Sequence, residues 1–136
     1  QRTGAYKLRG AYNRMSKLTP AERKKGVVAA SAGNHAQGVA LAARKLGIKA
    51  TIFMPIGASL PKLQATENYG AEVVLTGAVF AETLKAAQEY SAKKGAIFIP
   101  PFDHLDVIAG QGTVGLEIID ELADVDNIWL PSVAVA

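Results

Sequence analysis

Five short runs of apolar residues recur along the chain, and nearly every position within each run is apolar. They occupy residues 27–31, 50–54, 72–75, 96–99 and 127–130. A strand with one solvated face alternates between apolar and polar residues, whereas a strand that is covered on both faces does not. The pattern therefore predicts a sheet of about five strands that is buried on both sides.

Segments with apolar residues at helical spacing separate these runs, and glycine or proline marks most of their ends. They predict helices over residues 6–18, 34–46, 59–70 and 80–94, and a last helix over about 108–122. Strands that alternate with helices are typical of an α/β fold. We expect residues 1–136 to form a single domain, a three-layer, open, twisted and mainly parallel sheet with helices on both faces.

The composition narrows the class of protein. Hydrophobic residues make up 49% of the chain and charged residues 20%, which favours a globular domain over a disordered segment. The absence of cysteine excludes a disulfide scaffold, a cysteine-based zinc site and a thiol nucleophile. No apolar run approaches the length of a membrane helix, and none follows the basic N-terminus as in a signal peptide. We therefore expect a cytoplasmic protein with no membrane partner.

Charge is distributed unevenly although the net charge is only +3. The first 25 residues hold eight Lys or Arg against one acidic residue, whereas residues 103–136 hold seven acidic residues and no Lys or Arg. The basic segment could bind nucleic acid or another anion, or the two segments could attract each other. We favour mutual attraction and expect no nucleic-acid partner, because no aromatic ladder and no familiar nucleic-acid module accompanies the charge.

Ligands of parallel sheets bind at the carboxyl ends of the strands, which directs attention to the segment after the first predicted strand. Ser31, Ala32, Gly33, Asn34 and His35 follow that strand and open a helix, and we call these residues the 31–35 turn. Such a turn offers free backbone N–H groups and the positive end of a helix dipole to a carboxylate or phosphate. The alternative is a well-capped turn without a ligand, in which Asn34 is the cap and Gly33 has an unusual φ.

Other candidate motifs are weaker. Gly110, Gly112 and Gly115 match a dinucleotide fingerprint by letter, but the preceding strand ends ten residues earlier, so a glycine-rich helix start packed on the sheet is favoured. The two histidines, His35 and His104, lack further ligands at metal-binding spacing, and we expect no metal site. Lys7, taken alone, is typical of a solvated charge.

Four segments read together change this picture. They are residues 3–13 (TGAYKLRGAYN), 26–40 (GVVAASAGNHAQGVA), 100–104 (PPFDH) and 107–117 (VIAGQGTVGLE). In order and spacing they resemble the pyridoxal-phosphate-dependent threonine/serine dehydratases, and most of all the catabolic type of threonine ammonia-lyase. The resemblance covers nearly the whole chain and implies the smaller lobe, with flanking elements, of a fold-type II pyridoxal-phosphate enzyme.

The resemblance also implies roles for individual residues. Lys7 matches the catalytic lysine that binds pyridoxal 5′-phosphate through a Schiff base, and Asn34 matches a residue that contacts the ring oxygen of this cofactor. Ser31, Ala32, Gly33, Asn34 and His35 match the loop that binds the substrate carboxylate. The implied reaction is β-elimination from threonine or serine, in which the freed lysine removes the α-proton and the products are a 2-oxo acid and ammonia.

The chain departs from the family pattern in three ways. Ala5 and Tyr6 replace the Ser-Phe before the catalytic lysine, and residues 132–136 replace a glycine run that binds the cofactor phosphate. The larger cofactor-binding lobe, and the family segment that precedes Lys7, are missing from the sequence. We therefore expect an inactive fragment, which could form homo-oligomers through the face that the missing lobe leaves. The alternative is an excised or redesigned structural α/β domain with no cofactor and no catalysis.

Overall fold

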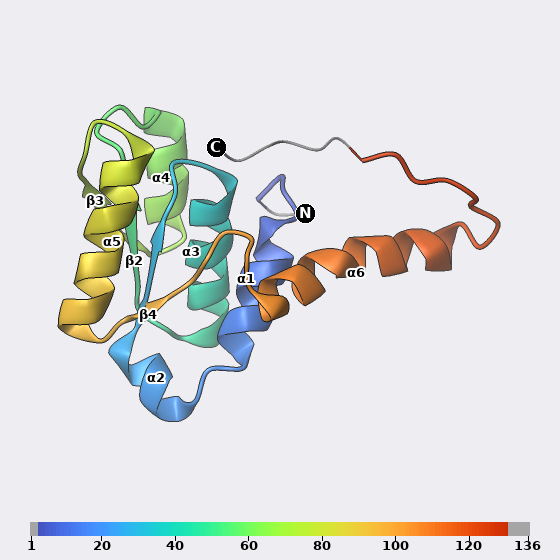
Figure 1. Cartoon of the computed structure of the whole chain (residues 1–136), viewed down its shortest axis with the longest axis horizontal. Coiled ribbons are helices and arrows are strands. Elements are labelled where there is room, and N and C mark those ends of the chain that lie inside the picture. Colours follow the sequence, from blue (N-terminus) through green and yellow to red (C-terminus); the bar gives the residue numbers. More distant parts are fainter. Residues whose placement is uncertain (1–2, 131–136) are drawn as a thin grey trace.

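The computed structural model describes residues 3–130 of the chain, within which strands and helices alternate (Figure 1). The helices are α1 (Lys7–Ser16), α2 (Pro20–Lys25), α3 (Asn34–Leu46), α4 (Leu60–Asn68), α5 (Phe80–Lys94) and α6 (Leu105–Glu121). The strands are β1 (Val27–Ala30), β2 (Ala50–Met54), β3 (Glu72–Leu75) and β4 (Ile97–Phe98). Within residues 3–130, no helix is both long and apolar enough to cross a membrane.

The strands form one parallel sheet in the order β3-β2-β1-β4. β1 is central and is buried at every position, and β2 beside it is also fully buried. Alternate residues of β1 enter different cores, Val27 and Ala29 on one face and Val28 and Ala30 on the other. This two-sided burial explains the continuous apolar runs, and the predicted α/β fold is confirmed.

Helices cover both faces of the sheet unequally (Figure 1). The larger core lies between the sheet and α3, with Met15 and Ala11 of α1 behind it and α4 at its side. On the opposite face α5 packs alone against β1 and β2, and its Tyr90 ring meets Phe53 at a centroid distance of 5.4 Å. The predicted three layers are therefore present.

The prediction of a fifth strand is wrong. Residues 127–130 are described by the structure and belong to no strand, and the Trp129 side chain is 92% exposed. A parallel strand forms only beside the edge of a sheet, and the chain after α6 runs well away from both sheet edges (Figure 1). An apolar run alone therefore did not specify a strand here.

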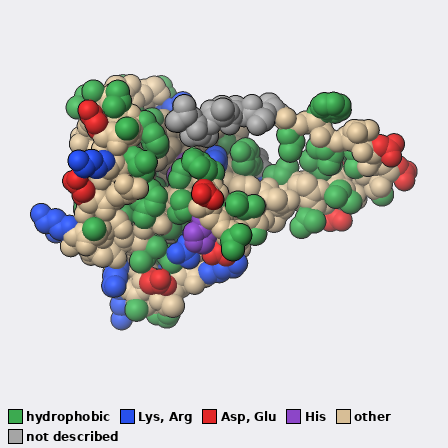
Figure 2. All heavy atoms as spheres, in the orientation of Figure 1, with side chains coloured by type: hydrophobic (Ala, Val, Ile, Leu, Met, Phe, Trp, Pro, Cys, Tyr) green, Lys and Arg blue, Asp and Glu red, His purple; other side chains and the backbone are tan. Residues whose placement is uncertain are grey.

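The last helix, α6, packs on α1 and projects away from the sheet (Figure 1). Apolar side chains are gathered along its outer part (Figure 2), and those that are exposed include Leu116, Ile119 and Leu122. The three glycines of the rejected dinucleotide motif lie within α6 and not at its start. Gly110 meets α1, so the expectation that this motif packs on the sheet is wrong.

Ion pairs join the basic and acidic segments, as expected. The Arg9 guanidinium donates to both carboxylate oxygens of Glu117, at 2.6 and 2.7 Å, and the Lys17 ammonium lies 2.6 Å from Asp106. These pairs connect α1 to α6. The charge gradient of the sequence therefore becomes an internal contact between two helices, which confirms the attraction that we favoured.

Candidate functional site

The carboxyl ends of the four parallel strands that the structure describes lie on one side of the sheet, which we call its carboxyl edge. The site residues predicted from the sequence gather there. β1 ends at Ala30 and is followed by the 31–35 turn, in which Asn34 and His35 already belong to α3. Lys7 is the first residue of α1, which runs beside α3 (Figure 1). The residue after β4, Ile99, reaches the same edge.

The backbone of the 31–35 turn is fixed by a side-chain hydrogen bond. The N–H of Gly33 donates to the Ser31 hydroxyl oxygen at 3.1 Å, and the N–H of Ser31 continues the sheet by donating to the Phe53 carbonyl. Gly33, and not Asn34, is the N-cap of α3, and its φ of −150° is an extended value. The alternative in which Asn34 caps the helix and Gly33 has an unusual φ is therefore wrong.

Free backbone donors follow this hydrogen bond. The first hydrogen bond of the regular helix pattern in α3 runs from the Gln37 N–H to the Gly33 carbonyl. The N–H groups of Asn34, His35 and Ala36 come before it, and within residues 3–130 they have no acceptor. The Asn34 side chain is exposed, and Ser31 is half-buried. Three unpaired N–H groups at the positive end of a 13-residue helix can bind an oxyanion.

Lys7 lies in a partly desolvated position. Its ammonium donates a hydrogen bond to the Pro101 carbonyl at 2.7 Å, across 94 residues of sequence. Burial lowers the pKa of Lys7 below its usual value of 10.5, because a partly apolar environment disfavours the charged form. A larger fraction of this side chain is therefore the neutral amine, which is the nucleophilic form.

His35 is the buried member of the turn, with only 4% of its surface exposed. Its Nε2 lies 2.9 Å from the Ile99 carbonyl, which can only accept, so Nε2 carries the proton and Nδ1 does not. The pKa of His35 is lowered to about 4, mainly by burial and in part by the nearby Lys7 charge, against the opposing effect of the Ile99 hydrogen bond. The imidazole is therefore neutral at pH 7, and its side chain faces the protein interior and not the solvent.

Two neighbouring carbonyls thus hold the two halves of the site together. Ile99 accepts from His35 and Pro101 accepts from Lys7, so the loop after β4 connects the turn to the lysine. The sequence motifs did not single out Ile99 or Pro101 for this purpose, because the groups involved are main-chain atoms that any residue type supplies. The position of β4 beside β1 is the signal that could have indicated them.

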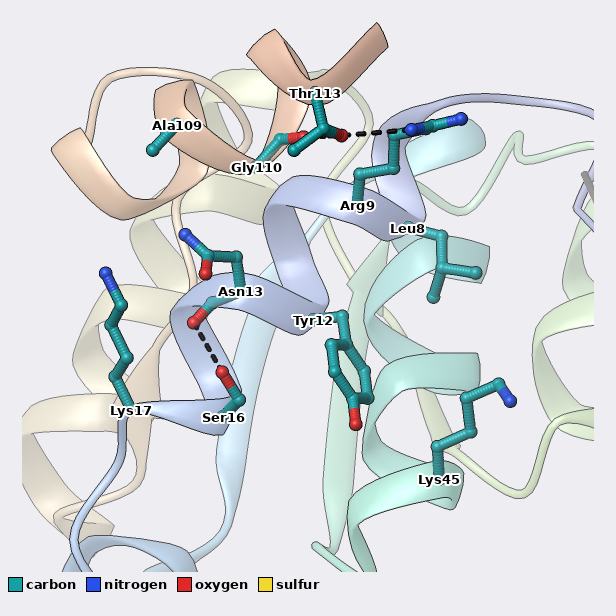
Figure 3. Close-up of a pocket in the computed structure, with 10 residues that line it drawn as sticks. All are labelled: Leu8, Arg9, Tyr12, Asn13, Ser16, Lys17, Lys45, Ala109, Gly110 and Thr113. Atoms are coloured by element: carbon teal, nitrogen blue, oxygen red, sulfur yellow. Dashed lines mark hydrogen bonds between the residues drawn. The ribbon is translucent and has the colours of Figure 1, made fainter. Parts of the chain in front are cut away.

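A groove of about 800 Å³ lies along α1, between α6 and the end of α3, but it is separate from this site (Figure 3). Most of its polar side chains already have partners. Arg9 donates to Thr113, Ser16 donates to the Asn13 carbonyl, and Lys17 pairs with Asp106. Neither Lys7 nor the 31–35 turn lines this groove. Within residues 3–130, no cluster of three side chains could hold a metal ion.

The fold and the site together define a parallel α/β unit that presents a lysine and a turn with unpaired backbone donors at the carboxyl edge of its sheet. Residues 1–134 match the family described as pyridoxal-phosphate dependent enzyme. The chain belongs to this family, and the resemblance found in the sequence motifs is confirmed.

Known relatives agree with this assignment. The chain is 56% identical to the catabolic L-threonine dehydratase of Escherichia coli strain K12 and to an L-threonine ammonia-lyase of Thermotoga maritima, over 131 residues and 96% of the chain in each case. It spans only 40% and 33% of the length of these two relatives.

Solved structures give the same result. A processed threonine deaminase isoform 2 from Solanum lycopersicum superposes with a TM-score of 0.89 at 51% identity, and a maize serine racemase with a TM-score of 0.89 at 36% identity. The superposition covers 92% of this chain in both comparisons, and 36% and 38% of the respective structures.

The residues present fit the cofactor of this family. Pyridoxal phosphate needs a primary amine that is neutral part of the time, and the Lys7 amine has a pKa that burial lowers. The unpaired N–H groups of the turn suit an oxyanion of the cofactor or of a substrate. Residues 132–136, where the sequence departs from the expected glycine run, lie outside the described residues.

Proposed function

We propose that this chain supplies the catalytic lysine and the carboxylate-binding turn of a pyridoxal-phosphate-dependent ammonia-lyase that acts on threonine or serine. The observation that carries the proposal is the convergence of Lys7 and the 31–35 turn on the Ile99 and Pro101 carbonyls. The names of the relatives support threonine as a substrate. The cytoplasmic location and the formation of homo-oligomers stay predictions.

Bound pyridoxal phosphate supplies a carbonyl group that condenses with amines and a ring that withdraws electrons from the substrate. Lys7 would hold the cofactor through its Nζ, and Asn34, which is exposed beside the turn, would contact the ring oxygen. Once released, Lys7 Nζ accepts the α-proton of the substrate, for which its lowered pKa is suited. The β-hydroxyl would leave as water, and the released enamine would then be hydrolysed by a water molecule to a 2-oxo acid and ammonia.

The turn binds the substrate carboxylate through main-chain donors. The N–H groups of Asn34, His35 and Ala36 have no acceptor within residues 3–130, whereas the N–H of Gly33 is occupied by Ser31. The His35 imidazole is buried against Ile99, so we assign to His35 only its backbone N–H in substrate binding. Ser31 and Ala32 shape the backbone that precedes these donors.

We further propose that the 136 residues alone are inactive. The chain spans at most 40% of the length of the two relatives described above, and Lys7 and the turn lie at an open edge of the sheet. The second candidate, a structural α/β domain that binds no cofactor, is favoured only by the replacement of the expected glycine run at residues 132–136.

Reductive labelling tests the proposal. Pyridoxal phosphate is added to the protein, the reversible lysine adduct is reduced with borohydride, and the modified lysine is identified by peptide mapping. We expect Lys7 to be modified first, and the Lys7→Arg variant to lose this selectivity. A statistical spread over Lys17, Lys24, Lys25 and Lys62 would support the structural domain and contradict the proposed function.

A further inference from the structure

Lys62 lies directly in front of the 31–35 turn. A Cβ atom built on Gly33 would lie 3.7 Å from the Lys62 Nζ, and among residues 3–130, apart from the chain neighbours of Gly33, no other residue comes within 4 Å of that point. The open side of Gly33 therefore faces an ammonium group. The sequence motifs gave no role to this lysine, which precedes the region of β3 by ten residues.

The topology of the sheet places Lys62 there. β2 pairs in parallel with β1, so the loop that leaves β2 and the turn that leaves β1 reach the same edge of the sheet (Figure 1). α4 begins in that loop, and Lys62 is its third residue. The Thr66 hydroxyl donates to the Lys62 carbonyl at 2.8 Å, and α4 packs beside α3, so the backbone that carries Lys62 is well fixed.

Neither the Lys62 ammonium nor the backbone donors of the turn have a partner among the described residues. In the part of the chain that the structure describes, Lys62 forms no ion pair and no side-chain hydrogen bond. The N–H groups of Asn34, His35 and Ala36 beside it also have no acceptor. The exposed Lys62 ammonium thus lies near Gly33, the residue that precedes the unpaired donors at the positive end of α3, and a cation together with such donors complements an oxyanion.

We propose that Lys62 is a substrate-binding residue, whose ammonium pairs with the carboxylate of the amino-acid substrate while the turn donates its backbone N–H groups. The inference rests on the proposed function, since it names a further residue of the same site. Gly33 belongs to this arrangement, because its missing side chain leaves room between the turn and the Lys62 ammonium. Lys62 thereby contributes to selection for substrates with a free carboxylate.

Amide chemical shifts test this without any catalytic step. The ¹⁵N-labelled protein is titrated with sodium acetate at constant ionic strength, and the amide signals of residues 33–36 give the dissociation constant. We expect Lys62→Gln to weaken acetate binding about fivefold, which is the effect of removing one charge about 4 Å from the carboxylate in a solvent-exposed site. Lys62→Arg should keep the affinity within about twofold. Lys45→Gln removes the same charge from the far end of α3 and should leave the affinity unchanged.

Equal acetate affinity in the wild-type protein and Lys62→Gln would overturn the inference, and so would an equal loss in Lys45→Gln or the absence of any wild-type shift at the turn. Inorganic phosphate is the second probe. A Lys62→Gln effect on phosphate alone would assign the lysine to the cofactor phosphate and overturn the carboxylate assignment. Selective labelling of Lys7 is read separately, so its failure would contradict the proposed function whatever the acetate result.

Discussion

Gly110 of α6 crosses Gly10 of α1 so closely that a Cβ atom built on Gly110 would lie 2.6 Å from the Gly10 Cα. The same point lies 2.6 Å from the Arg9 carbonyl oxygen. Gln111, the next residue of α6, accepts a hydrogen bond from the Gly10 N–H at 3.1 Å. The two helices therefore meet backbone to backbone, and α1, which carries Lys7, is held in place by this crossing.

We predict that Gly110→Ala lowers the free energy of unfolding by about 3 kcal/mol, because main-chain atoms cannot move aside as a flexible side chain can. Gly112→Ala is the matched control. It lies in the same helix with open space around its Cβ position, and alanine there should raise stability by about 0.5–1 kcal/mol. Urea denaturation measures both values. Equal effects of the two substitutions would mean that the crossing is looser than described.

The buried His35 should make the free energy of unfolding depend on pH between about pH 6.5 and pH 4. Its pKa is about 4 in the folded protein, whereas the ordinary value of a histidine is 6.5, so the unfolded chain binds the proton first as pH falls. Stability is therefore lost from about pH 6.5 down to pH 4, and the loss between pH 7.5 and pH 5 amounts to about 2 kcal/mol. We expect His35→Gln, which keeps an N–H donor for Ile99 but does not titrate, to lack this component.

Urea midpoints and slopes between pH 5 and 7.5 measure the effect. The carboxyl groups that the structure shifts do not interfere. Hydrogen bonds from Thr19, Lys17 and Arg9 lower the pKa values of Glu22, Asp106 and Glu117, respectively, so these groups take up protons below this window. Parallel stability curves for the wild-type protein and His35→Gln would show that His35 is solvated in the folded state.

Local sequence signals predicted the first and last residues of two helices correctly. α3 and α5 have the predicted bounds, and each ends at a glycine with a left-handed backbone, Gly47 at φ 65° and Gly95 at φ 71°. Glycine is the residue type that adopts this conformation readily, so a glycine after a helical pattern predicts where the helix ends. Lys7, by contrast, carries no local signal and became a candidate site residue only through the four motifs together.

The short helix α2 was not predicted, because the signal for its start was interpreted wrongly. The first predicted helix stops at residue 18, before the Thr19-Pro20 pair, and no helix is predicted directly after it, whereas Thr19 is the N-cap of α2. The Thr19 hydroxyl accepts from the Glu22 N–H, and the Glu22 carboxylate accepts from the Thr19 N–H at 2.8 Å. This capping box was readable as Thr-x-x-Glu, but proline was weighed as a terminator and not as a first-turn residue.

Long-range pairing explains what the sequence could not show. Residues 127–130 have the composition of a strand but lie beside no sheet edge. The Ile99 and Pro101 carbonyls and the position of Lys62 depend on the strand order β3-β2-β1-β4, which no single segment encodes. The site was thus predictable as a turn and a lysine, whereas the loop that joins them required the fold.

The last prediction concerns turnover by the 136 residues themselves. With pyridoxal phosphate and excess threonine, we expect no 2-oxobutanoate above the rate given by free pyridoxal phosphate. Catalysis requires the scissile bond and the ring to be held in a fixed relation and water to be excluded. Asn34 is exposed and Lys7 is only half-buried, so the described residues enclose the site on one side only. The sequence also carries Val133 and Val135 where the family resemblance implies glycines that bind the phosphate.

Covalent labelling and turnover should therefore separate. A reversible adduct at Lys7 needs only an accessible neutral amine, and the lowered pKa of Lys7 supplies one. Elimination also needs the reacting bond to be held in a fixed orientation, and the described residues enclose the site on one side only. A coupled assay for the 2-oxo acid decides the question, with Lys7→Ala as the inactive reference and Lys17→Ala as the control for loss of one charge. Production of the oxo acid that disappears in Lys7→Ala and persists in Lys17→Ala would show that this chain completes a catalytic site by itself.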